Sequence, residues 1–93
     1  MTIRTFRNKG LKKFFETGSK SGIQPALASK IELILDRLDA IEDPKDMNFP
    51  GSDFHQLQGK LKGFYSVHVN GNWVIIFQFE NGEATNVDLV DYH

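Results

Sequence analysis

The feature that most constrains the fold is a run of three strand-like segments in the last third of the chain. The segments cover Phe64–Asn70, Trp73–Glu80 and Ala84–Val90, and each is rich in β-branched and aromatic residues. Asn70-Gly71 and Asn81-Gly82 separate them, and this dipeptide is the strongest short-range signal of a tight hairpin turn. Strands joined by such turns pair antiparallel, so the sequence predicts a three-stranded meander.

The alternation within these strands predicts which face of the sheet is buried. A two-residue loop at Asn70-Gly71 would put Trp73 on the face of Ser66 and His68, because directly opposite residues share a face. We therefore expect loops with an odd residue count, such as a type I turn closed by a glycine bulge, which keep the apolar residues together for burial. The core face then holds Tyr65, Val67, Val69, Trp73, Ile75, Phe77, Phe79, Thr85, Val87 and Leu89. The second face, expected to meet water or a ligand, holds Phe64, Ser66, His68, Asn70, Val74, Ile76, Gln78, Asn86, Asp88 and Val90.

The first half of the chain predicts two helices. Residues 2–6 alternate as in a short strand, and residues 8–18 carry apolar side chains at helical spacing before a glycine suited to be a C-cap. Apolar residues then recur at helical spacing over about residues 24–41, whereas residues 43–63 read as irregular or weakly extended. The expected fold is a single α+β domain over residues 1–93, with a short N-terminal strand and two helices packed on one face of an antiparallel sheet meander.

Composition limits the class of protein further. Apolar residues make up 40% of the 93 residues, which suffices for one modest core, and the absence of cysteine excludes disulfides and thiolate metal sites. Residues 1–20 are too charged for a signal peptide, and no apolar stretch approaches the roughly 20 residues of a membrane span. We therefore expect a cytoplasmic protein with no membrane partner.

Charge is distributed unevenly along the chain. Residues 1–30 carry seven basic residues against one acidic residue, whereas residues 31–93 carry four against eleven, for a net charge of −1. A basic segment of this kind can face phosphates while the remainder faces a basic partner. From charge alone, an ordinary solvated helix face explains the same residues.

Several side chains suited to proton transfer gather near the predicted second face. His55 precedes the sheet, His68 lies within a strand, and Asp91-Tyr92-His93 ends the sequence. Cleavage of RNA by its own 2′-hydroxyl needs a base, positive charge on the phosphate and an acid, and these residue types suffice without a metal. A backbone-bonded loop histidine, a solvent-facing strand histidine and a frayed chain end remain open as readings of the same residues. The three histidines lack close metal-ligand spacing, so neither a metal site nor another cofactor is predicted.

The chain resembles the HigB branch of the RelE toxin superfamily over nearly its whole length. The resemblance is carried by Leu57-Gln58-Gly59, Gly63, Ser66–Asn70, Asn72-Trp73, Phe77 and Val90-Asp91-Tyr92-His93, and by Ile3–Phe6, Lys9-Gly10-Leu11, Phe15-Glu16, Gly18 and Leu38-Asp39-Ala40 nearer the start. It implies the RelE-like form of the α+β fold and the toxin of a type II toxin–antitoxin pair. Such a toxin cuts messenger RNA in the ribosomal A site, without a metal, by attack of a 2′-hydroxyl on the adjacent phosphate.

The resemblance also implies partners and site residues. The partners are the ribosome with its messenger RNA and a cognate helix-turn-helix antitoxin, through which alone the toxin meets operator DNA. By position, His55, Asp91, Tyr92 and His93 match the catalytic residues of the family. We expect His55 or Asp91 to be the base, His93 the acid and Tyr92 a stacking or orienting group; base and acid are not distinguished by sequence.

The chain departs from the family at positions expected to contact RNA. Many relatives have lysine where Gln58 stands, and arginine where Leu61, His68 and Val74 stand. A guanidinium makes bidentate phosphate contacts that a valine cannot replace. The expected RNA-binding residues are Lys60, Lys62, His68, Lys9, Lys12 and Lys13.

These departures leave a second hypothesis open: a weakly catalytic module that binds the antitoxin and regulates the operon. A third, gyrase poisoning as in other members of the superfamily, is disfavoured by the Asp-Tyr-His terminus.

Overall fold

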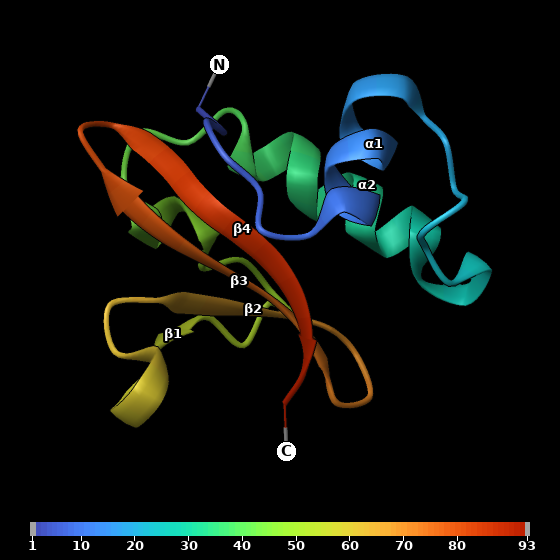
Figure 1. The fold of residues 1–93 in the computed structure, drawn as a ribbon. Helices are drawn as coiled ribbons and strands as arrows, with labels where there is room; N and C mark the ends of the chain where they lie inside the picture. Colours follow the sequence, from blue (N-terminus) through green and yellow to red (C-terminus); the bar gives the residue numbers. More distant parts are fainter. Residues whose placement is uncertain (1, 93) are drawn as a thin grey trace.

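The computed structural model describes residues 2–92, which form two helices, a four-stranded sheet and three short 3-10 turns (Figure 1). The α-helices are α1 (Lys9–Thr17) and α2 (Ala28–Leu38). The strands are β1 (His55–Gln56), β2 (Tyr65–Asn70), β3 (Trp73–Glu80) and β4 (Glu83–Asp91). The 3-10 turns are η1 (Pro25–Leu27), η2 (Pro44–Met47) and η3 (Gly59–Leu61). Neither described helix has the length and apolar character needed to span a membrane.

The sheet confirms the predicted meander and extends it by one strand. Its order is β1-β2-β3-β4, and every neighbouring pair is antiparallel. The added strand, β1, lies within the segment expected to be irregular or weakly extended, and it pairs His55 with Ser66 and Gln56 with Tyr65. A strand of two residues is too short to show an alternation of apolar and polar side chains, so the sequence pattern did not predict β1.

The predicted N-terminal strand is reduced to two isolated parallel bridges beside β4, Ile3 with Ala84 and Phe6 with Val87. Between them, the backbone N–H of Asn86 donates to Oγ1 of Thr5 at 2.8 Å instead of to a backbone carbonyl. The two bridges are three residues apart on both segments, and the regular pairing between them is interrupted at Asn86, which has a positive φ of 53°. Figure 1 shows the N-terminal segment running along β4 before it enters α1.

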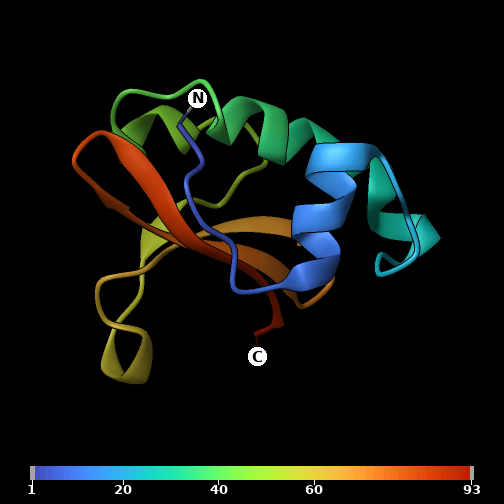
Figure 2. The same cartoon turned by 45° about the horizontal axis from the view of Figure 1, so that its top comes forward.

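The helices cover one face of the sheet, as predicted (Figure 2). Helix α1 begins after Asn8, whose side chain accepts from the Leu11 N–H, and ends at Gly18 in the left-handed conformation (φ 79°). Helix α2 is shorter than the predicted 24–41 because Pro25–Leu27 forms a 3-10 turn and the α-helix stops at Leu38. The main core lies between these helices and the sheet; its fully buried members include Leu11, Ile31, Ile34, Leu38, Val67, Ile75, Phe77 and Val87.

Two β-bulges, rather than odd-numbered loops, set the faces of the strands. Asn70 pairs with Trp73 and Glu80 with Glu83, so both hairpin loops have two residues, contrary to prediction. The register shifts between His68 and Asn70 in the first hairpin and between Ile76 and Gln78 in the second. The first bulge gives the expected pairing along most of β2 and β3, with Val67 opposite Ile75. Next to the turn, Asn70 lies opposite Trp73.

The second bulge makes part of the predicted face assignment wrong. On β4 it falls at Asn86, which has a positive φ of 53°. Before the bulge, Ala84 lies opposite Phe79 and Thr85 opposite Gln78, so Ala84 and not Thr85 belongs to the core face. After the bulge, Val87 returns to the core face as predicted. A bulge shifts the alternation by one residue, and its position depends on pairing between strands.

The second face is less open than predicted. Leu57, Phe64 and Ile76 form a smaller core there, with Leu61, Val74 and Val90 packed against it. Ile76, expected to face water or ligand, is 1% exposed. The segment from Leu57 to Phe64 supplies the cover, so only the remaining part of this face is available to a ligand.

Candidate functional site

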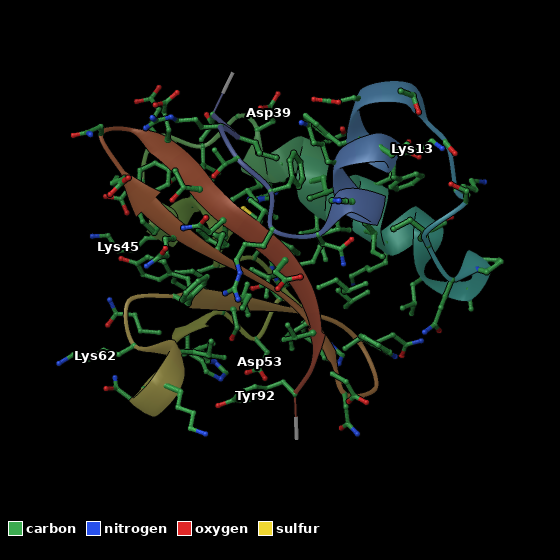
Figure 3. The ribbon with its side chains drawn as sticks, in the orientation of Figure 1. Lys13, Asp39, Lys45, Asp53, Lys62 and Tyr92 are labelled. Carbon is green, nitrogen blue, oxygen red and sulfur yellow. The ribbon has the colours of Figure 1, made fainter. Side chains whose placement is uncertain are left out.

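The uncovered part of the second face contains a shallow pocket of about 210 Å³, here called the histidine pocket. It lies where the turn before β1, the end of β2 and the chain beyond β4 meet, and Figure 3 shows Asp53 and Tyr92 side by side at this place. The residues that line it are Asp53, His55, Ser66, His68, Gly71, Asn72, Val74 and Tyr92.

His55 reaches this pocket because β1 is held against β2. His55 pairs opposite Ser66, and the next rung is the N–H of Leu57 donating to the Phe64 carbonyl at 2.9 Å. Leu57 is buried in the smaller core, which anchors the short strand from its far side. Upstream, the N–H of His68 donates to the Ser52 carbonyl at 2.7 Å, so the segment is tied to β2 on both sides of His55.

Asp53 joins the pocket through an unusual backbone conformation. Its φ is +47°, which turns the chain sharply just before β1. Its carboxylate Oδ1 lies 3.8 Å from Nδ1 of His55, within ion-pair range but beyond hydrogen-bond range. The two side chains are 78% and 53% exposed, so water screens their attraction strongly. Sequence reasoning missed Asp53, because only the fold turns its carboxylate toward the histidine.

His68 enters the pocket from β2 with a defined hydrogen bond. Its Nε2 lies 3.0 Å from the Gly71 carbonyl oxygen. Since a carbonyl oxygen only accepts, Nε2 carries the proton, and Nδ1 of the neutral ring is the basic nitrogen. Val74 lies opposite His68 across the strand pair, also in the pocket wall.

Tyr92 closes the pocket from the end of the chain. Its backbone N–H donates to the Asn72 carbonyl at 2.7 Å, so the chain is pinned to the β2–β3 turn rather than frayed at this point. Tyr92 is 47% exposed, and it lines the pocket. Asp91 pairs opposite Trp73 and is not among the lining residues. His93, the fourth predicted catalytic residue, lies outside the described residues.

The predicted RNA-binding lysines are divided between two parts of the molecule. Lys60 and Lys62 are exposed on and just after η3, beside β1. Lys9, Lys12 and Lys13 are exposed on α1, in the helix layer. Figure 3 shows both Lys13 and Lys62 apart from Asp53 and Tyr92. None of the five lines the histidine pocket, whereas His68 does.

The pocket therefore combines two imidazoles, a carboxylate and a phenol on an accessible surface. These groups can remove, hold or deliver a proton. The tyrosine ring also offers a flat face on which a nucleobase can stack. Within residues 2–92 there is no group of three His, Cys, Asp or Glu side chains arranged to hold a metal ion.

Comparison with known proteins identifies the class to which this fold and pocket belong. Residues 4–93 match the family described as RelE-like toxin of type II toxin–antitoxin system HigB. The chain is 39% identical to the "Endoribonuclease HigB" of Proteus vulgaris over 94 aligned residues, covering 98% of this chain and 99% of the relative. It is 37% identical to "Toxin HigB-1" of Vibrio cholerae, over 90% of each.

The chain therefore belongs to the HigB-like family of RelE-like toxins, whose partner is a cognate antitoxin. This confirms the family predicted from sequence, and the predicted endoribonuclease class is the activity named for the Proteus vulgaris relative.

The fold is shared more widely than the sequence. The solution structure of the conserved hypothetical protein HP0894 from Helicobacter pylori superposes with a TM-score of 0.51 at 19% identity, covering 96% of this chain and 94% of that one. At this identity the likeness concerns the fold alone, and it agrees with the predicted α+β arrangement.

Proposed function

We propose that this chain is the toxin of a type II pair and cleaves messenger RNA in the ribosomal A site, with the histidine pocket as its active site. The observation that carries the proposal is the meeting of His55, His68 and Tyr92 around one accessible hollow. These residues come from β1, from β2 and from the residue after β4, so their meeting depends on how the strands pair. Membership in the HigB-like family and the activity named for the Proteus vulgaris relative support the same substrate class.

The proposed reaction is an internal transfer within the RNA. A base takes the proton of a 2′-hydroxyl, and that oxygen bonds to the adjacent phosphorus while the bond to the 5′-oxygen breaks. An acid gives a proton to the leaving 5′-oxygen, so the products end in a 2′,3′-cyclic phosphate and a 5′-hydroxyl. We assign the base to His55 or Asp91, the acid to His93, and stacking or orientation to Tyr92.

The remaining basic residues are assigned to binding. Lys60, Lys62 and His68 contact the RNA near the cut, and Lys9, Lys12 and Lys13 contact ribosomal RNA from the helix layer. In the cytoplasm, a helix-turn-helix antitoxin neutralises the toxin and carries it to operator DNA. The Val74 position in the pocket wall favours one alternative, a weakly cutting module that serves mainly to bind this antitoxin.

The test is cleavage of a translated message by purified protein, with the 5′ ends mapped on ribosomes and on naked RNA. We expect cuts confined to translated message. His55→Ala lowers the cleavage rate by about 10²–10⁴-fold, the usual contribution of a general acid or base. Gln56→Ala is the matched control, because Gln56 is the other exposed residue of β1 and does not line the histidine pocket. Cleavage by His55→Ala at the wild-type rate would remove His55 from the mechanism, and no cleavage by the wild type would favour the binding module.

A further inference from the structure

Arg7 lies on the N-terminal segment, which bridges to the outer edge of β4. Its backbone N–H donates to the Val87 carbonyl at 2.8 Å. The preceding residue, Phe6, packs against the main core and lies 5.8 Å from the Phe15 ring, measured between centroids. The chain bends at Arg7, and its side chain contacts Phe64 and Asp88 rather than the main core.

The Arg7 side chain reaches over the edge onto the second face. Its guanidinium carbon lies 5.7 Å from the centroid of the Phe64 ring, a cation–π distance. Its Nε lies 4.0 Å from Oδ2 of Asp88, which pairs opposite Ile76. Phe64 and Ile76 both belong to the smaller core, so the guanidinium stands on the same face of the sheet as the histidine pocket.

Arg7 is also within reach of a ligand in that pocket. Val90 pairs opposite Val74, a pocket residue, and Asp88 lies two residues before Val90 on the same strand. Two residues of a strand span about 7 Å and neighbouring strands lie about 4.8 Å apart, so the backbone of Asp88 is roughly 8–9 Å from that of Val74. The Arg7 side chain is 51% exposed and that of Asp88 is 21% exposed, and a contact of 4.0 Å lies at the limit of an ion pair, so this pairing is weak. A phosphate can therefore replace Asp88 as its partner while the ring of Phe64 still supports it.

We infer that Arg7 is an RNA-contacting residue, which binds the phosphate next to the one that is cut. This rests on the proposed function and adds to it a residue that neither the spacing nor the family pattern had indicated. No arginine is among the residues that line the histidine pocket. Arg7 brings a guanidinium to the same face from a different segment, with the fork geometry that suits phosphate.

The experiment compares Arg7→Gln with Arg4→Gln. Arg4 lies on the same N-terminal segment, is 55% exposed and pairs with Glu83 at 4.0 Å, but Glu83 begins β4 at the end remote from Tyr92. The two substitutions thus remove the same charge and a similar ion pair. Because the contact exists before and during the reaction, Arg7→Gln raises the KM for programmed ribosomes by about tenfold and leaves kcat within about twofold. Arg4→Gln changes neither value beyond about twofold.

Binding of a single-stranded RNA oligonucleotide gives a readout that needs no cleavage. The slope of log affinity against log salt falls by about 0.7 in Arg7→Gln, the value for one lost phosphate contact, and is unchanged in Arg4→Gln. Asp88→Asn removes the competing carboxylate and leaves KM equal to or below that of the wild type. Equal effects of the two arginine substitutions, or a rise of KM in Asp88→Asn, would overturn the inference. A wild type that neither cuts message nor binds the oligonucleotide would instead overturn the proposed function, and the inference with it.

Discussion

At the scale of single residues, Val74 puts an apolar side chain in the wall of the histidine pocket. Val74 lies opposite His68, lines the histidine pocket and packs against the smaller core. An arginine at this place could donate to a phosphate in the pocket. The valine offers no donor, and in other enzymes the loss of one transition-state donor lowers the rate by about 10²–10³-fold.

Val74→Arg is therefore predicted to increase the rate of message cleavage by about tenfold or more, because it adds a charged donor to the pocket wall. The measurement is the single-turnover rate on programmed ribosomes, with thermal unfolding as a check that the fold is kept. Val74→Gln is the control, since it lengthens the side chain and adds polarity without charge. If Val74→Arg were no faster than Val74→Gln, a missing guanidinium at this position would not limit the reaction.

At the scale of elements, the bulge at Asn86 determines what β4 presents to each face. Asn86 has a positive φ, its N–H donates to Oγ1 of Thr5, and its side-chain amide donates to Oε1 of Gln78 at 2.7 Å. The bulge brings Ala84 into the core and separates the two bridges that hold the N-terminal segment. The N-terminal segment also carries Arg7, whose backbone N–H donates to the carbonyl of Val87, directly after the bulge. The bulge therefore helps to position Arg7 beside the second face.

The backbone conformation at this bulge predicts a difference between two substitutions. Asn86→Ala and Asn86→Gly both remove the hydrogen bond to Gln78, but only alanine has a Cβ that strains a left-handed residue. We expect Asn86→Ala to have a free energy of unfolding about 1–2 kcal/mol lower than that of Asn86→Gly. Urea denaturation followed by circular dichroism measures both values. Equal stabilities would mean that the bulge relaxes when asparagine is removed.

At the scale of the whole molecule, the N-terminal segment joins the helix layer to the sheet. The N–H groups of Thr2 and Ile3 both donate to Oδ1 of Asp39, just after α2, at 3.1 Å each. The Thr2 carbonyl accepts from the N–H of Ala84 in β4 at 2.7 Å. Two residues thus connect the end of α2 to the edge of the sheet.

Asp39→Ala is predicted to destabilise the protein because the Ile3 N–H loses its charged acceptor and the Thr2 N–H keeps only the Asp39 backbone carbonyl, 3.0 Å away. We expect the free energy of unfolding to fall by about 1–3 kcal/mol, the cost of removing the partner of part-buried donors. Asp36→Ala, an exposed residue of α2, serves as the matched control and changes stability by less than about 0.5 kcal/mol. The comparison uses urea midpoints at constant m-value. Similar losses in the two variants would show that the connection through Asp39 contributes little.

Local chemistry allowed much of the framework to be predicted from the sequence. The Asn-Gly turns, the apolar alternation that includes Val67 and Ile75, and the capping residues Asn8 and Gly18 act over a few residues. For this reason the three strands of the meander and the first helix were predicted correctly, whereas the N-terminal strand and β1 were not. The likeness to a known family supplied the residues proposed for catalysis. Among them, the structure brings His55 and Tyr92 to one pocket with His68, whereas it divides the proposed RNA-binding lysines between two layers.

What the sequence by itself determined was the meander, the helical face that covers it and the family. Only the tertiary structure decided the position of each bulge, the two-residue strand that carries His55, the cover over Ile76 and the reach of Arg7 onto the second face. The physical reason is the range of the interactions. Turn chemistry and apolar periodicity act between near neighbours, whereas these features depend on pairing and packing between segments distant in the chain.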